Sequence, residues 1–495
     1  MRKLQVAALA LLLVVPGCSA GSSATVSSDP NSLSIGFTAE PQNFDFTGTD
    51  GSAIPQALLY NVYEGLVKLD ANGKIVPLLA SSWTVSADRK TYDFQLQPGV
   101  KFSNGAPFTA DDVKFSLMRV KTDWKISIKS KMAIVDHVDV VDPGHARVVL
   151  GKPSNNWLFD MTTRLGAMFS PTGVADLANT AIGTGPYVVA ERRRGDSIIL
   201  RENPGYWGHK PTYSTVYLKY IKDPTALNNA LLSNGIDVIS TISAPDSIPQ
   251  FESDKRFNVI QGTTNSEVTL AFNDAKAPLN DVRVRQALTY AIDRKALLDT
   301  AWAGRGTLIG SMVPPTDPWY QDLSAVYPFD PARAKSMLAE AGQMNLSLRL
   351  RIPNLPYAVS AAQVVASELA DIGVKVSIEP LDFPAVWLKQ VFTGHDFDLS
   401  IVQHVEARDI TTFGDPTYYW GYHNPQVKAL LAQADSGSAD EQVTAMREVA
   451  KTLNTDAAAD WLFLFPNVIV AKTKVTGLAK NQVSESFDLT GLGRS

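Results

Sequence analysis

Apolar and polar residues alternate in short runs up to about residue 265, and this period of two is typical of strands with one buried face. The runs predict strands at 33–37, 83–86, 91–96, 188–189, 198–200 and 236–239, with a hairpin turn at 87–90. Apolar residues at helical spacing predict helices at 53–66, 108–116 and 225–234. Thr109 is the expected N-cap of the second helix. We therefore expect this part of the chain to be rich in strands.

Helical periodicity is stronger after about residue 265. It predicts helices at 281–303, 331–341, 358–372, 425–434 and 440–453, and further strands at 346–352, 374–378 and 463–465. The strand, helix and strand within 346–378 alternate as in an α/β unit. No repeat with a period of about 20–50 residues is visible, which argues against a solenoid or a propeller.

The N-terminus carries a targeting pattern. Arg2 and Lys3 precede an uncharged apolar run at 6–15, which is too short to span a bilayer but fits a secretory signal peptide. Gly17 and the single cysteine, Cys18, follow this run and resemble the lipobox of bacterial lipoproteins. That resemblance implies a signal peptide at 1–17, lipidation of Cys18 and a flexible tether at 18–30. The alternative is an ordinary secretory signal with an incidental cysteine.

Composition excludes several classes of protein. With 495 residues, 45% of them hydrophobic, the chain can fill two or three domain cores. A net charge of −5 argues against a nucleic-acid partner, and one cysteine excludes an internal disulfide and a multi-cysteine metal site. The GxxxxGK, GxSxG and HExxH motifs are absent. We therefore expect no catalysis and no cofactor. The six histidines form no ligand pair on one helix face, so we also expect no metal site.

Several stretches, in the right order, resemble the extracellular solute-binding proteins of peptide-type ABC importers, known as solute-binding protein family 5. The resemblance rests on Ile75-Val-Pro-Leu-Leu-Ala-Ser-Ser-Trp83, residues 86–94 and 96–102, Asn104-Gly-Ala-Pro-Phe-Thr-Ala-Asp-Asp-Val113, Gly183-Thr-Gly-Pro-Tyr187, Asn203-Pro-Gly-Tyr-Trp207 and Asp281-Val-Arg-Val-Arg-Gln-Ala-Leu288. It extends from about residue 33 to the C-terminus.

The family resemblance implies an α/β, two-lobed periplasmic-binding-protein-like fold (class II, cluster C) with an extra inserted domain. Lobe I is expected to be discontinuous and lobe III continuous, so that only two chain crossings join them. The expected boundaries are 31–54, 179–262 and 472–495 for lobe I, 55–178 for the inserted domain II, and 263–471 for lobe III. Hinge closure around a ligand in the cleft between the lobes is the expected motion.

In peptide-binding members of the family, an acidic residue of the second lobe anchors the ammonium group of the ligand. The matching stretch here is 403–410, and Asp409 falls at the anchoring position. Glu406 can instead supply the anchor, and Arg408 can either neutralise Asp409 or clamp a ligand carboxylate. The alternative is that these three residues form a surface ion-pair cluster.

Further candidate residues for the ligand site lie nearby or on the other lobe. His404 belongs to the same stretch, and an aromatic group follows it that can either form a wall of the cleft or pack in the core beneath it. The aromatic candidates are Tyr418, Tyr419 and Trp420, together with Phe44 at the expected cleft rim of the first lobe.

The resulting prediction is a monomeric, lipid-anchored receptor outside the cytoplasm. It captures a peptide or another amine-bearing small solute and delivers it to an ABC permease and ATPase. Alternatives are import of a nickel chelate or haem, a sensory receptor and, last, a surface hydrolase.

Overall fold

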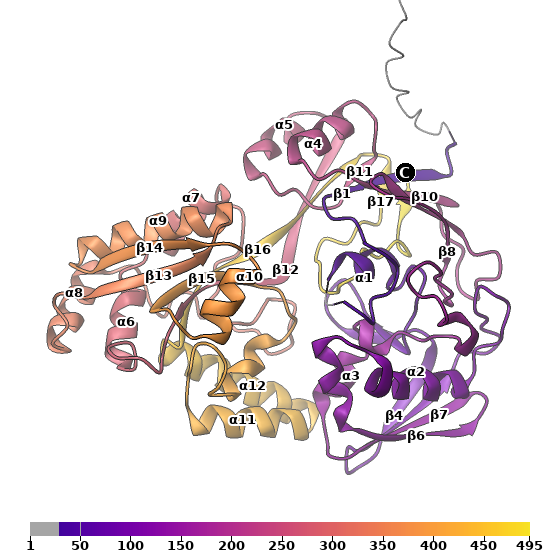
Figure 1. Cartoon of the computed structure of the whole chain (residues 1–495), viewed down its shortest axis with the longest axis horizontal. Helices are drawn as coiled ribbons and strands as arrows, with labels where there is room; N and C mark the ends of the chain where they lie inside the picture. Colours follow the sequence, from indigo (N-terminus) through magenta and orange to yellow (C-terminus); the bar gives the residue numbers. More distant parts are fainter. Residues whose placement is uncertain (1–28, 50) are drawn as a thin grey trace, which may run out of the picture.

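The chain forms two halves that share one large sheet, as Figure 1 shows for this computed structural model. The structure describes residues 29–49 and 51–495, so the predicted signal peptide and Cys18 lie outside the described residues. The ten strands of the sheet follow the order β14-β13-β15-β12-β16-β11-β1-β10-β9-β8. Within the described ranges, no helix combines the length and the apolar character that crossing a bilayer requires.

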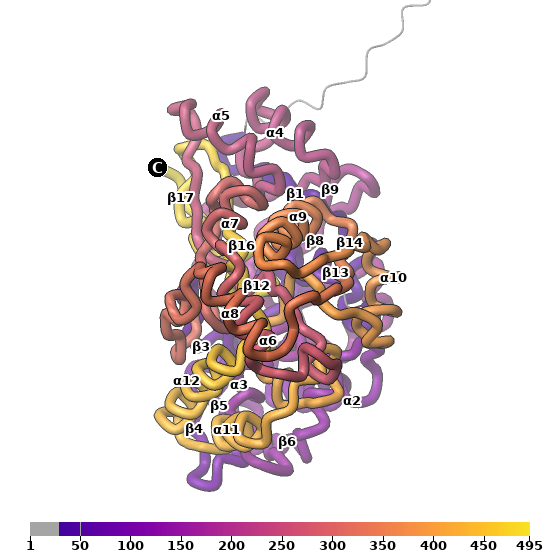
Figure 2. Tube along the Cα trace, turned by 90° about the vertical axis from the view of Figure 1, so that its left-hand side faces the viewer, coloured from indigo at the N-terminus to yellow at the C-terminus, as the bar shows by residue number. Residues whose placement is uncertain are grey.

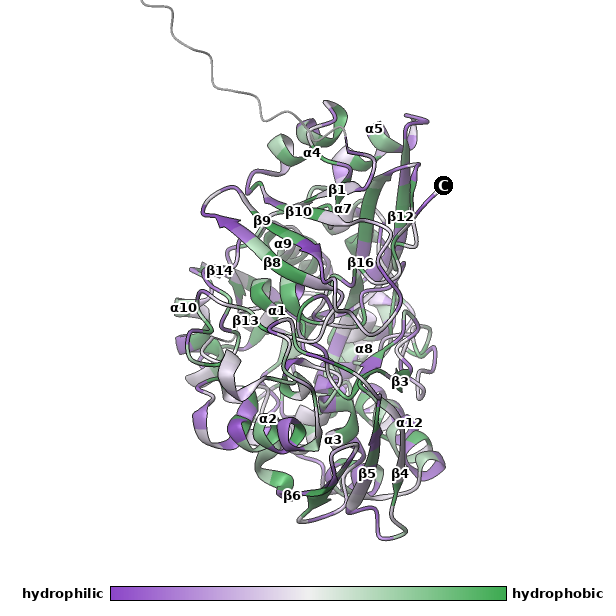
Figure 3. Cartoon of the chain, turned by 90° about the vertical axis from the view of Figure 1, so that its right-hand side faces the viewer, coloured by the Kyte–Doolittle hydropathy of each residue, from purple (hydrophilic) through white to green (hydrophobic). Residues whose placement is uncertain are grey.

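The first half of the sheet contains β1 (Ser32–Phe37), β8 (Tyr187–Arg193), β9 (Ser197–Glu202), β10 (Thr215–Tyr220) and β11 (Val238–Ile239). β1 lies between β10 and β11 and pairs with both in parallel, whereas β8, β9 and β10 pair in antiparallel fashion. The helices of this half are α1 (Ala53–Leu58), α4 (Pro224–Leu232), α5 (Ile248–Glu252) and the short η4 (Pro245–Ser247). Because side chains alternate between the two faces of a strand, Ile35 and Leu200 point into the hydrophobic core of this half. The outer end of β8 is hydrophilic (Figure 3).

Residues 67–173 add a smaller layer to this half. Its strands are β2 (Val67–Leu69), β3 (Ile75–Pro77), β4 (Ala80–Val85), β5 (Thr91–Leu96), β6 (Val135–Asp142) and β7 (His145–Leu150). Its helices are α2 (Ala110–Asp123), η1 (Ser127–Ile134), α3 (Asn155–Asp160), η2 (Arg164–Gly166) and η3 (Pro171–Gly173). Thr109 caps α2 in a capping box with Asp112, which confirms the predicted N-cap. The aromatic rings of Tyr92, Phe94 and Trp157 pack together between the sheet and α3.

The second half alternates strands and helices. Its strands are β13 (Ser347–Pro353), β14 (Lys375–Leu381) and β15 (Leu399–His404). Its helices are α6 (Val282–Tyr290), α7 (Arg294–Trp302), α8 (Pro331–Glu340), α9 (Pro356–Asp371), α10 (Ala385–Trp387), η5 (Leu388–Thr393), η6 (Asp409–Gly414), α11 (Pro425–Ser436) and α12 (Ala439–Thr455). β13 and β14 pair in parallel with α9 between them, as predicted for an α/β unit. Figure 2 shows α6, α7, α8 and α9 together on one outer side.

Two long antiparallel strands join the halves: β12 (Phe257–Phe272) and β16 (Ala459–Lys472). Their register shifts between Thr263 and Glu267, at the point where the strands pass from one half to the other. Beyond this shift, β12 also pairs with β15 and sets Glu267 opposite His404. The remaining strands, β17 (Val475–Thr476) and β18 (Gly493–Arg494), pair with each other near the C-terminus.

Two predicted helices differ from the structure. The predicted helix at 53–66 ends at Leu58, because Leu59 is extended and Tyr60 takes a positive φ of 64°. The predicted helix at 281–303 is two helices, α6 and α7. The side chain of Asp293 accepts hydrogen bonds from the backbone amides of Lys295 and Ala296, and so begins α7 as a new N-cap.

Candidate ligand-binding site

The chain turns sharply after β15 and returns toward the strand it has just left. Arg408 adopts a left-handed conformation with φ of 62°, which is uncommon for a residue other than glycine and occurs preferentially at functional sites. The turn brings the first residue of η6, Asp409, back to the end of β15. His404 Nδ1 and Asp409 Oδ2 are therefore 3.3 Å apart, although four residues lie between them in the sequence.

Asp409 is a buried carboxylate that contacts His404 but makes no hydrogen bond of standard geometry. Its residue is only 7% exposed, and neither of its carboxylate oxygens has a hydrogen-bond partner. Burial raises the pKa of Asp409 above its ordinary value; His404 opposes this rise, and the negative charge of Glu406 adds to it. Burying a carboxylate that lacks hydrogen bonds costs free energy. A cation that binds beside it therefore contributes more binding free energy than the same contact would at the surface.

Asp409 lines a cleft of about 1070 Å³ between the two halves. The second half contributes Glu406, Arg408, Asp409 and Tyr418, and the smaller layer of the first half contributes Lys131, Phe159 and Asp160. Lys131 and Asp160 already form an ion pair, with 2.9 Å between Nζ and Oδ1. Asp409 therefore lines a space that is large enough for a small solute, although its carboxylate oxygens are themselves buried.

Arg408 does not pair with Asp409. Its guanidinium carbon lies 3.7 Å from the centre of the Phe159 ring and 4.7 Å from that of Trp319, and its ion pair, at 4.0 Å, is with Asp317. Burial lowers the pKa of Arg408 to about 10. Because Phe159 belongs to the first half and Trp319 to the second, Arg408 forms a cation–π contact across the cleft.

Two further carboxylates near Asp409 were not predicted from the sequence. Glu267 is 2% exposed, and burial, followed by the charge of Asp409, raises its pKa well above the ordinary value. Burial also raises the pKa of Asp317 to about 6, with Arg408 opposing and Asp409 adding to the rise. The sequence signal for Glu267 is an acidic residue at the start of the apolar run 267–272.

The aromatic candidates separate into two groups. Tyr418 lines the cleft, whereas Tyr419 and Trp420 are buried. The Tyr419 hydroxyl lies 3.0 Å from His404 Nε2, and Trp420 stacks on Phe413 with 4.1 Å between ring centres. Phe44 is buried in the first half under Arg192 and is not among the described residues that line the cleft. The geometry therefore leaves Tyr418 as the aromatic residue of this set that a ligand in the cleft would meet.

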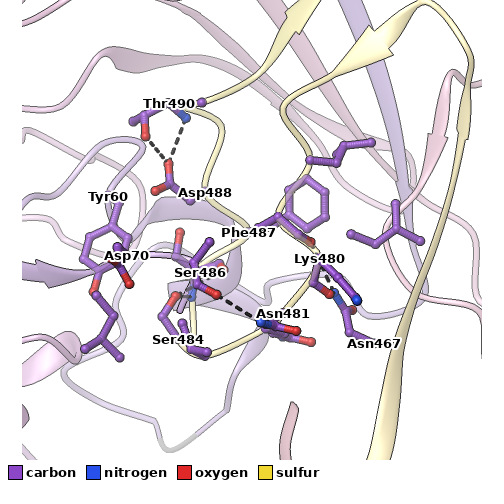
Figure 4. A pocket seen from close by; sticks show the side chains of 18 of the residues that line it. Tyr60, Asp70, Asn467, Lys480, Asn481, Ser484, Ser486, Phe487, Asp488 and Thr490 are labelled. Carbon is purple, nitrogen blue, oxygen red and sulfur yellow. Dashed lines mark hydrogen bonds between the residues drawn. The ribbon is translucent and has the colours of Figure 1, made fainter. Parts of the chain in front are cut away.

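A second cavity of about 430 Å³ lies behind the C-terminal segment 477–491. Figure 4 shows it between Tyr60 and Asp70 on one side and Asn467 and Lys480 on the other. The charged group of Lys68 at this cavity is already paired with Asp488, at 3.1 Å. The cleft, with its unpartnered Asp409, is therefore the stronger candidate for the ligand site.

Comparisons with known proteins identify the family of the chain. Residues 74–449 match the family described as bacterial extracellular solute-binding proteins, family 5 Middle. The chain is 30% identical over 374 residues to the dipeptide-binding protein of Escherichia coli K12, with 68% of each chain covered. It is 28% identical over 415 residues to di/tripeptide-binding protein 2 of Pseudomonas aeruginosa, with 76% of this chain and 77% of that protein covered.

A solved structure supports the same assignment at the level of the fold. HbpA2 from Haemophilus parasuis superposes with a TM-score of 0.84 at 22% identity, over 94% of this chain and all of that chain. This similarity confirms the predicted two-lobed α/β fold. The chain belongs to the bacterial extracellular solute-binding proteins of family 5.

Proposed function

We propose that the protein captures a small peptide, or another amine-bearing solute, in the cleft and delivers it unchanged to an ABC permease and its ATPase. The observation that carries this proposal is the buried carboxylate of Asp409, which belongs to a residue that lines the cleft and whose oxygens make no hydrogen bond of standard geometry. Two relatives are named for binding dipeptides and di- or tripeptides, which supports this class of solute. Other relatives are named for nickel, glutathione and haem.

Asp409 is the proposed anchor for the ammonium group. An ammonium donates up to three hydrogen bonds, and a charge-assisted bond of this kind contributes about 1.5–3 kcal/mol. The positive charge also stabilises the ionised form of Asp409 and so opposes the rise of its pKa that burial causes. Glu406 is exposed at the edge of the same cleft and is the second acid within reach of a bound amine.

We also propose that the halves act as closing lobes on a membrane-anchored monomer. Lobe I comprises 31–54, 179–262 and 472–495, lobe III comprises 263–471, and domain II is inserted at 55–178. Cys18 would carry the lipid anchor. Mass spectrometry of the N-terminal peptide from membrane-extracted protein tests this, since a lipidated Cys18 at the mature N-terminus is expected and an unmodified Cys18 contradicts it.

The Asp409→Asn variant tests the proposed anchor. Native mass spectrometry with a library of short peptides first selects a bound peptide, and calorimetry then measures its affinity for each variant. We expect Asp409→Asn to weaken binding by about tenfold or more, because the amide keeps the shape of the side chain but not its charge. Thermal stability is expected to stay the same or rise, since the variant removes an uncompensated buried carboxylate.

Two controls make this test specific. Asp415→Asn changes an exposed carboxylate six residues further along and should leave peptide affinity unchanged. The same peptide with an acetylated N-terminus should bind the wild-type protein poorly. Equal binding of the free and acetylated peptides, or wild-type affinity in Asp409→Asn, would reject Asp409 as the ammonium anchor.

A further inference from the structure

Three residues of one turn bring metal-ligating atoms together at the cleft. A nitrogen of His404 and one carboxylate oxygen each of Glu406 and Asp409 all lie within 4.8 Å of one another. His404 and Asp409 are buried, whereas Glu406 is exposed to the cleft. The spacing His-x-Glu-x-x-Asp does not follow a helix face, and the sequence alone predicts no metal site here.

The distance between His404 and Asp409 is compatible with two ligands of one metal ion. His404 Nδ1 and Asp409 Oδ2 are 3.3 Å apart, whereas a charge-assisted hydrogen bond between such groups measures about 2.7–2.9 Å. Two ligands at about 2.0–2.1 Å from a tetrahedral zinc ion are about 3.3 Å apart. The pair therefore already has the separation of two ligands on one ion.

The outer contact of His404 also matches that of a metal ligand. His404 Nε2 lies 3.0 Å from the hydroxyl oxygen of Tyr419, which is buried. When Nε2–H donates to this oxygen, the lone pair of Nδ1 points to Asp409. Histidine ligands commonly have their second nitrogen held in this way, because the contact fixes both the tautomer and the ring orientation.

An independent observation on the neighbouring strand shows that the place lacks positive charge. Glu267, on β12, lies directly opposite His404 and is only 2% exposed. Its Oε2 has no hydrogen-bond partner. Both oxygens of Asp409 and Oδ2 of Asp317 are also without a partner. The side chain of Arg408, next to Asp409 in the sequence, is turned toward Phe159 and Asp317. A divalent ion would bring two positive charges where an ammonium brings one.

We propose that His404 Nδ1 and the carboxylates of Glu406 and Asp409 bind one divalent transition-metal ion, with a remaining coordination position open to the cleft. One imidazole with two carboxylates suits zinc or nickel rather than calcium or magnesium, which prefer oxygen ligands alone. The open position would accept a nitrogen or oxygen atom of the captured solute. This last step rests on the proposed function, whereas the metal site itself does not.

Zinc binding to the full-length protein, without peptide, tests the site. Equilibrium dialysis with metal analysis, after treatment with a chelator, is expected to find one zinc ion per chain. The variants His404→Gln and Glu406→Gln should each weaken zinc binding by about tenfold or more. Glutamine at 404 can still bond to Tyr419, and the thermal unfolding of each variant shows whether it is folded. His209→Gln, at an exposed histidine far along the chain, is the matched control and should bind zinc as the wild type does.

The outcomes separate this inference from the proposed function. Wild-type protein that binds no zinc, or folded His404→Gln that binds zinc as tightly as the wild type, would overturn the metal site. Peptide binding is measured separately on the zinc-free protein. Peptide binding without zinc binding would support the proposed function and reject the metal site. Zinc binding without peptide binding would support the metal site and reject the proposed function.

Discussion

Glu64 is a fully buried carboxylate that joins segments far apart in the sequence. Its Oε2 accepts hydrogen bonds from Thr184 Oγ1 at 2.8 Å and from Trp207 Nε1 at 3.0 Å, and its Oε1 accepts one from the Tyr206 hydroxyl at 3.0 Å. These donors belong to the stretches 183–187 and 203–207, which carry the family resemblance. Burial nevertheless outweighs the three donors and raises the pKa of Glu64 from 4.5 to about 7.

The raised pKa of Glu64 predicts a pH-dependent stability. The folded state holds this proton more tightly than the unfolded state, so the contribution is fully present below pH 4.5 and is lost as the pH rises through about 7. A rise of this size corresponds to about 3 kcal/mol. In Glu64→Gln, the neutral amide should remove this part of the pH dependence. Urea unfolding of both proteins between pH 4.5 and 8 measures the difference in their free energies of unfolding. The variant should become increasingly more stable than the wild type as the pH rises.

Glu64→Ala serves as the control for this prediction. It leaves three buried donors unpaired and should destabilise the protein by several kcal/mol at every pH, since each unsatisfied group costs about 1–3 kcal/mol. Parallel pH profiles of Glu64→Gln and the wild type would show that Glu64 stays ionised in the folded protein.

The site residues differ in how far the sequence could predict them. The family resemblance placed Asp409 at the anchoring position, and the structure places it in the cleft. Glu267 and Asp317 are 142 and 92 positions away from Asp409 along the chain, so their proximity depends on pairing that no local pattern reveals. The neighbour of Asp409 in the sequence, Arg408, points elsewhere because its left-handed backbone turns the chain.

At the level of elements, a local signal predicted the start of α2 but not the end of α1. Thr109 begins α2 as predicted. The end of α1 at Leu58 depends instead on distant segments, because the Tyr60 hydroxyl donates to the carbonyl of Thr162 and the Asn61 side chain donates to that of Phe487. The apolar residues at 53–66 fit a helix equally well, so the sequence could not show where it stops.

The capping box of α12 gives a prediction at this scale. The backbone amide of Ser438 donates to Glu441 Oε2 at 2.6 Å, and that of Glu441 donates to Ser438 Oγ at 3.3 Å. Ser438→Ala should lower the free energy of unfolding by about 1 kcal/mol, because the amide of Glu441 loses its acceptor. Chemical denaturation measures the change. Thr444→Ala, an exposed position inside the same helix, should not destabilise the protein, and equal losses in both variants would argue against a capping role.

At the level of the whole molecule, the halves touch at a place remote from the two crossing strands. Figure 1 and Figure 2 show α3 beside α11. Ser154 Oγ donates to Asp435 Oδ1 at 2.7 Å, and Asn155 Nδ2 lies 2.8 Å from the carbonyl oxygens of both Ala434 and Gly437. Asn155 thereby satisfies carbonyls at the C-terminal end of α11, which have no partner within the helix. The family resemblance gives the two lobes but not these contacts, since they depend on side chains at 154–155 and on where α11 ends.

These contacts predict a link between closure and affinity. An opening about β12 and β16 would separate α3 from α11, so Asn155→Ala should favour the open arrangement by about 1–2 kcal/mol. Because a ligand held between the halves needs the closed arrangement, its apparent affinity should fall by about five- to thirtyfold. Calorimetry with the selected peptide measures this loss, and small-angle scattering should show a larger ligand-free molecule.

The control for Asn155→Ala is Ser436→Ala, in the last turn of α11. The Ser436 hydroxyl bonds within its own helix, to the carbonyl of Ala432, so this variant should keep wild-type affinity. Asn155 does not itself line the cleft, but Ser154 and Asn156 do, so a loss of affinity is assigned to the equilibrium between open and closed forms only when the scattering also changes. Unchanged affinity together with unchanged scattering would mean that the contacts of Asn155 with α11 do not stabilise closure.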